Sequence, residues 1–130
     1  MTKLHRSGED YLEAILILQN KNGSVRSSDV ADYMNVTRPS VSRAIGILKS
    51  GGFLVMNEDK TIALTDVGKE NARQVYERHC VLKDHLVSLG VDPEIAEQDA
   101  CGIEHIISHE SFEKIKGLWM KPRTESLAQG

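Results

Sequence analysis

The sequence predicts a mostly α-helical protein, in which an N-terminal winged helix-turn-helix with a β-hairpin wing precedes an all-helical region. Three observations lead to this fold class. Apolar residues recur at helical spacing through most of the 130 residues. Two short helical segments are joined by a tight turn at Asn35-Val36. Two short apolar runs, separated by a polar stretch, follow Gly51-Gly52 and predict a hairpin.

The first helix is predicted to start at Ser7, because Ser7 and Asp10 form an N-capping pattern and apolar residues then recur at helical spacing. The polar stretch 20–23, which ends in glycine, terminates this helix. Ser27-Ser28-Asp29 predicts the start of a short second helix, in which the two serines are interpreted as caps.

The third helix is predicted to run from about Pro39 to Ser50, because proline is favoured in a first helical turn and Gly51-Gly52 follows. Its apolar positions recur on one face, which is therefore predicted to be buried: Val41, Ala44, Ile45 and Leu48. The opposite face is then available to an outside partner.

A β-hairpin is predicted from the apolar runs 53–56 and 61–64, which flank a polar turn. A long helix capped by Thr65 or Asp66 then extends to about Leu89. Two further helices are expected, one from Asp92-Pro93 to about residue 107 and one capped by Ser108. These elements predict a winged helix-turn-helix domain over 1–65, a helical domain over 66–120 and a flexible tail over 121–130.

Composition limits the functional classes. No apolar run approaches the length of a membrane helix and the first ten residues are polar, so a cytoplasmic protein is expected. Two cysteines, Cys80 and Cys101, are too few for a disulfide framework and are expected to remain thiols. The net charge is −3, but residues 1–50 carry seven Lys or Arg against five Asp or Glu, whereas residues 61–130 carry eight against twelve. A weakly basic half therefore precedes an acidic half.

Thiol, carboxylate and imidazole groups come together at Cys101, Glu104 and His105, which a helix would place on one side. Asp10 and Glu13 have helical spacing near the N-terminus, and His79 lies between the two groups. Oxygen, nitrogen and sulfur donors from separate segments suit a transition metal whose binding depends on how the fold brings those segments together. The alternatives are first-turn acids for Asp10 and Glu13, a buried apolar thiol and an ordinary surface histidine.

The helix-turn-helix pattern predicts that the third helix enters the major groove of double-stranded DNA. Arginine is suited to guanine or phosphate, the hydroxyls offer short donors and acceptors, and proline can contact a thymine methyl. The alternative is a set of ordinary solvated helix residues. The predicted DNA-binding residues are Arg26, Thr37, Arg38, Pro39, Ser40, Ser42 and Arg43.

With these pieces in order, the chain resembles the DtxR/MntR family of metal-dependent transcriptional repressors, in its short form without the SH3-like domain. The resemblance extends from about Ser7 to Trp119 and rests on five strings in order. These are Glu9-Asp10-Tyr11-Leu12-Glu13, Thr37-Arg38-Pro39-Ser40-Val41-Ser42, Leu64-Thr65-Asp66-Val67-Gly68, Arg78-His79 and Asp99-Ala100-Cys101-Gly102-Ile103-Glu104-His105.

Carried over by position, the resemblance implies six metal ligands: Asp10, Glu13, His79, Cys101, Glu104 and His105. Five of them match the manganese-regulator pattern, but Cys101 stands where those proteins have glutamate. The iron-responsive members have this cysteine but carry methionine in place of Asp10. Lys83 and Glu97 stand where the second carboxylate and second histidine of the iron group's ancillary site would be. The site is a hybrid, and one or two metals per protomer are both open.

The resemblance implies a repressor of metal-uptake genes that binds a palindromic operator as a homodimer, with Mn²⁺ or Fe²⁺ as corepressor. Zn²⁺ and Co²⁺ are also expected to bind in vitro. Late apolar residues are the predicted dimer contacts, with core packing within the protomer as the competing interpretation: Ile106, Ile107, Phe112, Leu118 and Trp119. Two other functions compete, a winged-helix regulator of an organic effector and a small metalloenzyme. The second ranks low because no substrate cleft is evident, so no enzyme is expected.

Overall fold

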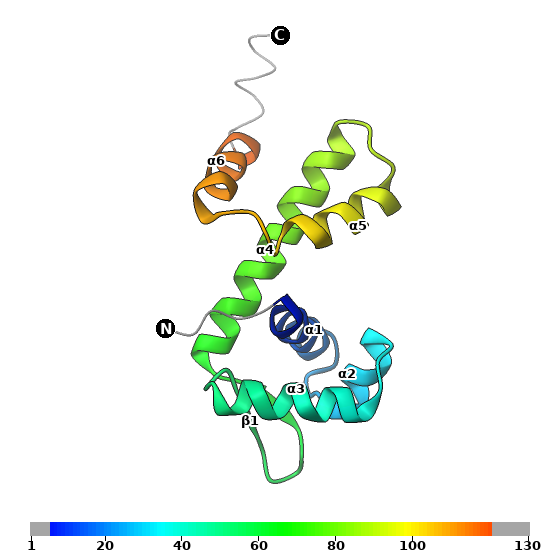
Figure 1. Cartoon of the computed structure of the whole chain (residues 1–130), viewed down its shortest axis with the longest axis vertical. Helices are drawn as coiled ribbons and strands as arrows, with labels where there is room; N and C mark the ends of the chain where they lie inside the picture. The colour runs from blue at the N-terminus through cyan, green and yellow to red at the C-terminus, as the bar shows by residue number, and fades with distance from the viewer. Residues whose placement is uncertain (1–5, 121–130) are drawn as a thin grey trace. The chain divides into compact units, whose positions relative to one another are not determined.

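The computed structural model describes residues 6–120, so the predicted tail 121–130 lies outside the described residues. Figure 1 shows the elements, which confirm a mostly α-helical chain with one antiparallel hairpin. The chain divides into two compact units, Met1–Tyr76 and Glu77–Gly130, each considered by itself below. The helices and strands follow in this order along the chain: α1 (Arg6–Asn22), α2 (Ser27–Met34), α3 (Arg38–Ser50), β1 (Leu54–Met56), β2 (Ile62–Leu64), α4 (Asp66–Ser88), α5 (Pro93–Ile103) and α6 (His109–Met120).

The caps of the first two helices differ from the sequence predictions. Helix α1 already includes Arg6, so Ser7 lies within the helix and does not cap it. Helix α2 is capped by Arg26, whose backbone N–H donates to the Asp29 carboxylate at 2.9 Å. Ser27 and Ser28 are therefore the first two helical residues, and the prediction that they act as caps was wrong. An acidic side chain in the first turn supplies the acceptor instead.

A left-handed residue makes the turn between α2 and α3. Asn35 has φ 56° and ψ 50°, a conformation that asparagine tolerates better than most residues, and its N–H donates to the Ala31 carbonyl. Thr37 then caps α3, which begins at Arg38, one residue before the predicted start. Gly51 ends the helix as expected.

The hairpin pairs β1 with β2 in antiparallel register, with Leu54 opposite Leu64 and Met56 opposite Ile62. The Ile62 N–H also donates to the Val25 carbonyl at 2.7 Å, which ties the hairpin to the segment before α2. Leu54, Ile62 and Leu64 are buried, so the strands present an apolar side to the helices.

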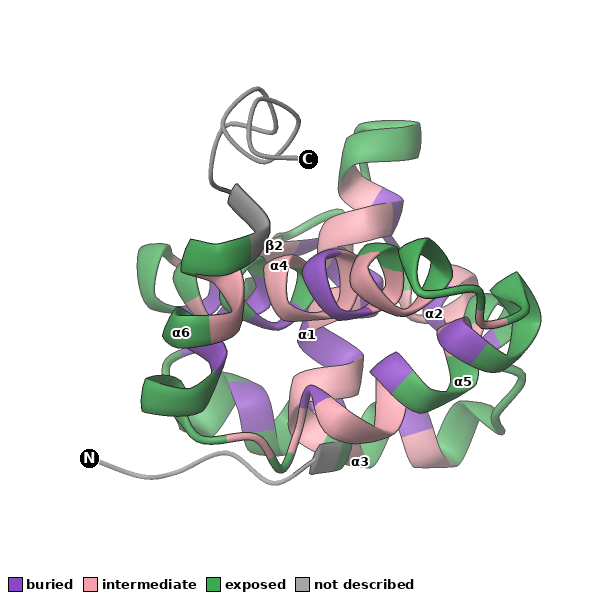
Figure 2. Ribbon diagram, turned by 90° about the horizontal axis from the view of Figure 1, so that it is seen from above, coloured by how far each residue is buried: buried purple, intermediate pink, exposed green. Residues whose placement is uncertain are grey.

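The N-terminal unit has one apolar core, formed by α1, α2, α3, the hairpin and the first turns of α4. Figure 2 marks the buried positions on these elements in purple. The largest fully buried side chains of this core are Leu12, Ile15, Val25, Val30, Val41, Leu48 and Leu54.

A close backbone approach fixes the start of α4. The Thr65 N–H donates to the Phe53 carbonyl at 3.1 Å, and the Thr65 hydroxyl donates to the Gly52 carbonyl. A Cβ on Gly68 would lie 1.8 Å from the Phe53 carbonyl oxygen, so only glycine fits. Thr65 also caps α4 by accepting from the Gly68 N–H, which confirms the first of the two predicted caps.

The C-terminal unit contains the rest of α4 together with α5 and α6. Asp92 caps α5 and Pro93 follows it, as predicted. Helix α5 ends at Ile103, four residues before the predicted end near residue 107. Glu104 is its C-cap, and the N–H groups of Ile106 and Ile107 both donate to the Ile103 carbonyl in the turn that follows. Ser108 caps α6 through the Ser111 N–H.

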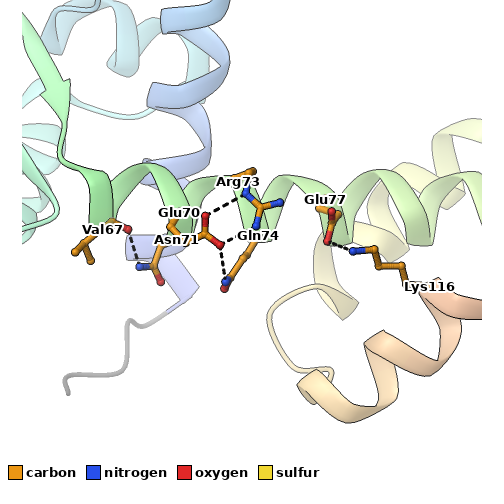
Figure 3. Close-up of polar contacts among 7 residues, drawn as sticks. All are labelled: Val67, Glu70, Asn71, Arg73, Gln74, Glu77 and Lys116. Atoms are coloured by element: carbon orange, nitrogen blue, oxygen red, sulfur yellow. Dashed lines mark hydrogen bonds and ion pairs between the residues drawn. The ribbon is translucent and has the colours of Figure 1, made fainter. Parts of the chain in front are cut away.

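Polar contacts follow the exposed side of α4 (Figure 3). Arg73 donates to both oxygens of Glu70, and Gln74 donates to the same carboxylate. The Arg73 and Gln74 hydrogen bonds lower the pKa of Glu70 below its ordinary value. In the C-terminal unit Lys116 of α6 forms an ion pair with Glu77 at 3.0 Å.

None of the helices within residues 6–120 is long and apolar enough to cross a membrane.

Candidate metal centre and DNA-contacting helix

Helix α3 starts with a side-chain cap built from two of the predicted DNA-binding residues. The Ser40 N–H donates to the Thr37 hydroxyl oxygen at 3.3 Å, and the two hydroxyls share a hydrogen bond of 2.8 Å. Both residues therefore have a structural role at the helix start. Thr37 is exposed and Ser40 is half-buried, and DNA binding by both stays a prediction.

The exposed side of α3 carries the rest of the predicted DNA-binding residues in this helix. Arg38, Pro39, Ser42 and Arg43 are exposed, whereas Val41, Ile45 and Leu48 are buried in the core. This alternation gives α3 one side fixed in the protein and one side open to a partner. Arg26 is also exposed, at the start of α2.

The end of α5 brings together the thiol, carboxylate and imidazole that the sequence singled out. Cys101 lies in the last turn of α5, Glu104 caps it, and His105 follows directly. One ligand atom from each lies within 4.8 Å of those from the other two. Glu104 is fully buried and is the one buried charged side chain among the described residues. His105 Nε2 lies 3.3 Å from Glu104 Oε1, and the His105 side chain is 2% exposed.

His79 comes to this group from α4. Its Nδ1 lies 3.1 Å from Glu104 Oε2, and its Nε2 contacts Glu97 Oε2 from α5. His79 is thus flanked by a carboxylate at each ring nitrogen. The sequence prediction placed His79 among the ligands, but the contact with Glu97 was missed.

Glu97 is in turn held by Lys83, whose Nζ donates to Glu97 Oε1 at 2.9 Å. Partial burial acts to raise the pKa of Glu97, but Lys83 and His79 outweigh it and lower that pKa below 4.5. The same hydrogen bond raises the pKa of Lys83. The pair is charged at neutral pH. The sequence offered one signal for this pair: Lys83 lies four residues after His79, so a helix places both on one face.

Arg78 supports the turn that contains Glu104. Its guanidinium donates to the Glu104 carbonyl at 3.4 Å and lies over the Phe112 ring, 5.8 Å from the centroid. A cation at the carbonyl end of α5 is electrostatically favourable. Sequence reasoning noted Arg78 beside His79 but gave it no role.

The donor group fits a divalent transition metal. Glu104 Oε1 is buried and makes no hydrogen bond, although His105 lies beside it. A buried carboxylate oxygen without a hydrogen-bond donor is costly, and a bound cation would compensate for it. Thiolate, imidazole and carboxylate donors suit Fe²⁺, Co²⁺, Zn²⁺ and Mn²⁺.

The remaining predicted ligands belong to the N-terminal unit. Asp10 and Glu13 lie on α1, three residues apart and therefore on neighbouring positions of one face. Both side chains are half-buried. Their part in metal binding stays a prediction.

The predicted dimer contacts differ in exposure. Ile106 and Leu118 are 81% and 64% exposed, and Ile107 is half-buried. Phe112 is 2% exposed and packs against Arg78, which favours the competing interpretation of core packing. The Trp119 side chain lies outside the described residues.

A winged helix-turn-helix that exposes arginines, with a helical unit that gathers metal-binding donors, defines a metal-dependent DNA-binding regulator. Residues 3–62 match the family model of the iron dependent repressor N-terminal DNA binding domain. Residues 65–126 match that of the iron dependent repressor metal binding and dimerisation domain. The chain belongs to the DtxR/MntR family of metal-dependent transcriptional regulators, which confirms the resemblance.

Relatives and a solved structure agree with this assignment. The transcriptional regulator MntR of Salmonella typhimurium is 37% identical over 105 residues, which are 81% of this chain and 67% of that protein. The HTH-type transcriptional regulator MntR of Lysinibacillus sphaericus is 34% identical over 112 residues, or 86% and 81% of the two chains. A manganese-dependent transcriptional repressor, solved in complex with manganese, aligns with TM-score 0.77 and 25% identity. That alignment covers 89% of this chain but only 54% of the solved one.

The family assignment sets the general function. The chain is a DNA-binding transcriptional regulator that depends on a divalent transition metal and forms a homodimer. The domain boundary after residue 65 stays a prediction.

Proposed function

We propose that this chain represses metal-uptake genes in the cytoplasm, with Mn²⁺ or Fe²⁺ as corepressor. The observation that carries this proposal is the buried Glu104 carboxylate, flanked by His79 and His105 and close to Cys101. A bound cation offsets the negative charge that this unit buries. We take Asp10 and Glu13 as the remaining ligands because they match the family pattern at their positions in the sequence.

The DNA side of the proposal rests on α3. Arg38 and Arg43 would contact guanine or phosphate, and Ser42 and Pro39 would contact base edges, because these side chains are exposed near the start of the helix. A two-fold homodimer with its α3 helices about 34 Å apart fits a palindromic operator. A bound cation that orders the protein before it meets DNA lowers the free-energy cost of ordering during DNA binding. The metal therefore acts as a corepressor.

The test is anaerobic fluorescence anisotropy of the full chain on its own promoter region, in EDTA and then with Mn²⁺, Fe²⁺, Co²⁺ or Zn²⁺ added. Binding that appears only with metal is the expected result. Equal binding in EDTA would contradict metal dependence and would favour an organic effector or none.

Cys101 decides the metal ranking, because it replaces a carboxylate of the manganese-regulator pattern with a softer thiolate. Cys101→Glu is expected to move the response towards Mn²⁺, and Cys101→Ala to weaken the response to every metal. Cys80→Ala is the matched control, since Cys80 is also half-buried but is not a proposed ligand. An unchanged ranking in both Cys101 variants would remove this residue from the site.

A further inference from the structure

A carboxylate outside the proposed ligand set contacts His79 and is itself paired with a lysine. Glu97 Oε2 contacts His79 Nε2, and Lys83 Nζ lies 2.9 Å from the other oxygen of the same carboxylate. His79 and Lys83 are four residues apart on α4, whereas Glu97 comes from α5. The three side chains therefore form a chain of contacts from Lys83 through Glu97 to Nε2 of His79.

The two nitrogens of His79 face different surroundings. The Nε2 side is directed at Glu97, a partly exposed carboxylate with 47% of its side chain accessible. The Nδ1 side is directed at Glu104 Oε2, which is fully buried and belongs to the proposed metal centre. With a metal bound beside Glu104, Nδ1 would have to be the unprotonated nitrogen, and the ring N–H would then lie on Nε2, where the Glu97 carboxylate can accept it.

We propose that Glu97, held by Lys83, is a positioning residue for His79: it fixes the ring so that Nδ1 is the metal-binding nitrogen. The inference rests on the proposed function of the centre. Partners of this kind orient a metal-binding histidine and typically change metal affinity by roughly 10- to 100-fold when removed. Lys83 contributes by limiting the rotation of the Glu97 carboxylate.

The pair is accessible to substitution without damage to a core. Lys83 and Glu97, with 34% and 47% of their side chains exposed, line a surface pocket of about 350 Å³ together with Pro93, Glu94 and Gln98. The unit also offers a matched control. Lys116 and Glu77 form a second ion pair anchored on α4, with a distance of 3.0 Å and exposures of 32% and 31%.

The first measurement is the affinity of the reduced full chain for Zn²⁺, by competition with a chromophoric chelator. Glu97→Ala is expected to weaken binding by roughly 10- to 100-fold. Glu97→Gln, which keeps an acceptor oxygen, is expected to recover most of this loss. Lys116→Met is expected to leave the affinity unchanged.

Lys83→Met separates positioning from simple charge. Loss of a nearby positive charge by itself would strengthen cation binding, because the site becomes more negative. Positioning predicts the opposite, a several-fold weakening, because Glu97 loses the group that holds it. Tighter Zn²⁺ binding in Lys83→Met would overturn the proposal.

The second measurement identifies the binding nitrogen from ¹⁵N chemical shifts of the histidine rings in the Zn²⁺-loaded chain. The wild type is expected to show His79 bound through Nδ1 and protonated at Nε2. In Glu97→Ala, the spectrum is expected no longer to show His79 bound through Nδ1 alone.

Unchanged affinity and an unchanged Nδ1 signature in Glu97→Ala would refute the role of Glu97. An equal loss in Lys116→Met would also refute it, by showing a general effect of ion pairs in this unit. Failure of the proposed function itself looks different, because the wild type would then bind no metal at this centre.

Discussion

The two units of this chain bury different kinds of side chain. The core of the N-terminal unit consists of apolar residues from α1, α2, α3, the hairpin and the start of α4. The C-terminal unit buries Glu104 completely, with His105 2% exposed beside it. Apolar burial is favourable by itself, whereas a buried carboxylate needs partners or a cation. Bound metal is thus expected to change the stability of the C-terminal unit more than that of the N-terminal unit, whose core is apolar.

The largest expected effect tests whether the C-terminal unit also depends on an apolar contact. Phe112→Ala removes a ring that is 2% exposed and lies beneath Arg78, and it is expected to lower the free energy of unfolding by about 3–5 kcal/mol. Urea unfolding of the metal-free full chain, followed by circular dichroism, measures it. Leu89→Ala, at a side chain that is 68% exposed, is the control. A loss below about 1 kcal/mol for Phe112→Ala would mean that polar contacts hold α6 instead.

The next effect tests the polar side of the comparison. Glu104→Gln keeps the shape of the side chain but removes the carboxylate ligand, so metal-dependent DNA binding is expected to weaken by at least about 100-fold, the upper end of the loss seen for mere supporting partners of ligands. In EDTA the melting temperature is expected to be unchanged or higher, because an unmetallated buried charge costs stability. Glu113→Gln, at an exposed position of α6, is the control. Normal metal activation in Glu104→Gln would remove this carboxylate from the centre.

A third prediction concerns the N-terminal unit alone. Gly68→Ala would place a Cβ 1.8 Å from the Phe53 carbonyl oxygen, so the start of α4 must shift, at an expected cost of about 2–3 kcal/mol in unfolding free energy. Gly46→Ala, on α3, meets nothing within 4 Å and is expected to gain roughly 0.5–1 kcal/mol. Thermal unfolding in EDTA compares the two. Equal effects in both variants would contradict the close approach.

The smallest expected effect is at the surface of α4. The Arg73 and Gln74 hydrogen bonds lower the pKa of Glu70, so their contribution is present above its ordinary value of 4.5 and is lost as pH falls through the lowered pKa. Arg73→Ala is expected to cause a barely resolvable drop in melting temperature at pH 7 and a smaller one at pH 3. The ion pair is more than half exposed, and such pairs contribute little. A drop in melting temperature of equal size at both pH values would show that lost packing of the Arg73 side chain, and not the lost ion pair, causes it.

Local signals in the sequence predicted most of the elements. Apolar periodicity placed the helices and the hairpin, and Thr37, Asp92 and Ser108 lie at helix starts as their residue types suggest. The errors occurred where two local signals compete. Ser27 and Ser28 have the side chains of caps, but the Asp29 carboxylate reaches the Arg26 N–H from within the first turn. The end of α5 was overextended because the residues after Ile103 remain in turns with helix-like hydrogen bonds.

The sequence by itself determined the fold class, the family and the donor types, because spacing and residue chemistry are local properties. Only the tertiary structure decided that Glu104 is fully buried, that Phe112 packs inside its unit and that Glu97 contacts His79. Each of these depends on which faces of α4, α5 and α6 meet. Such packing is set by the sum of many contacts between residues distant in sequence, which no single segment encodes.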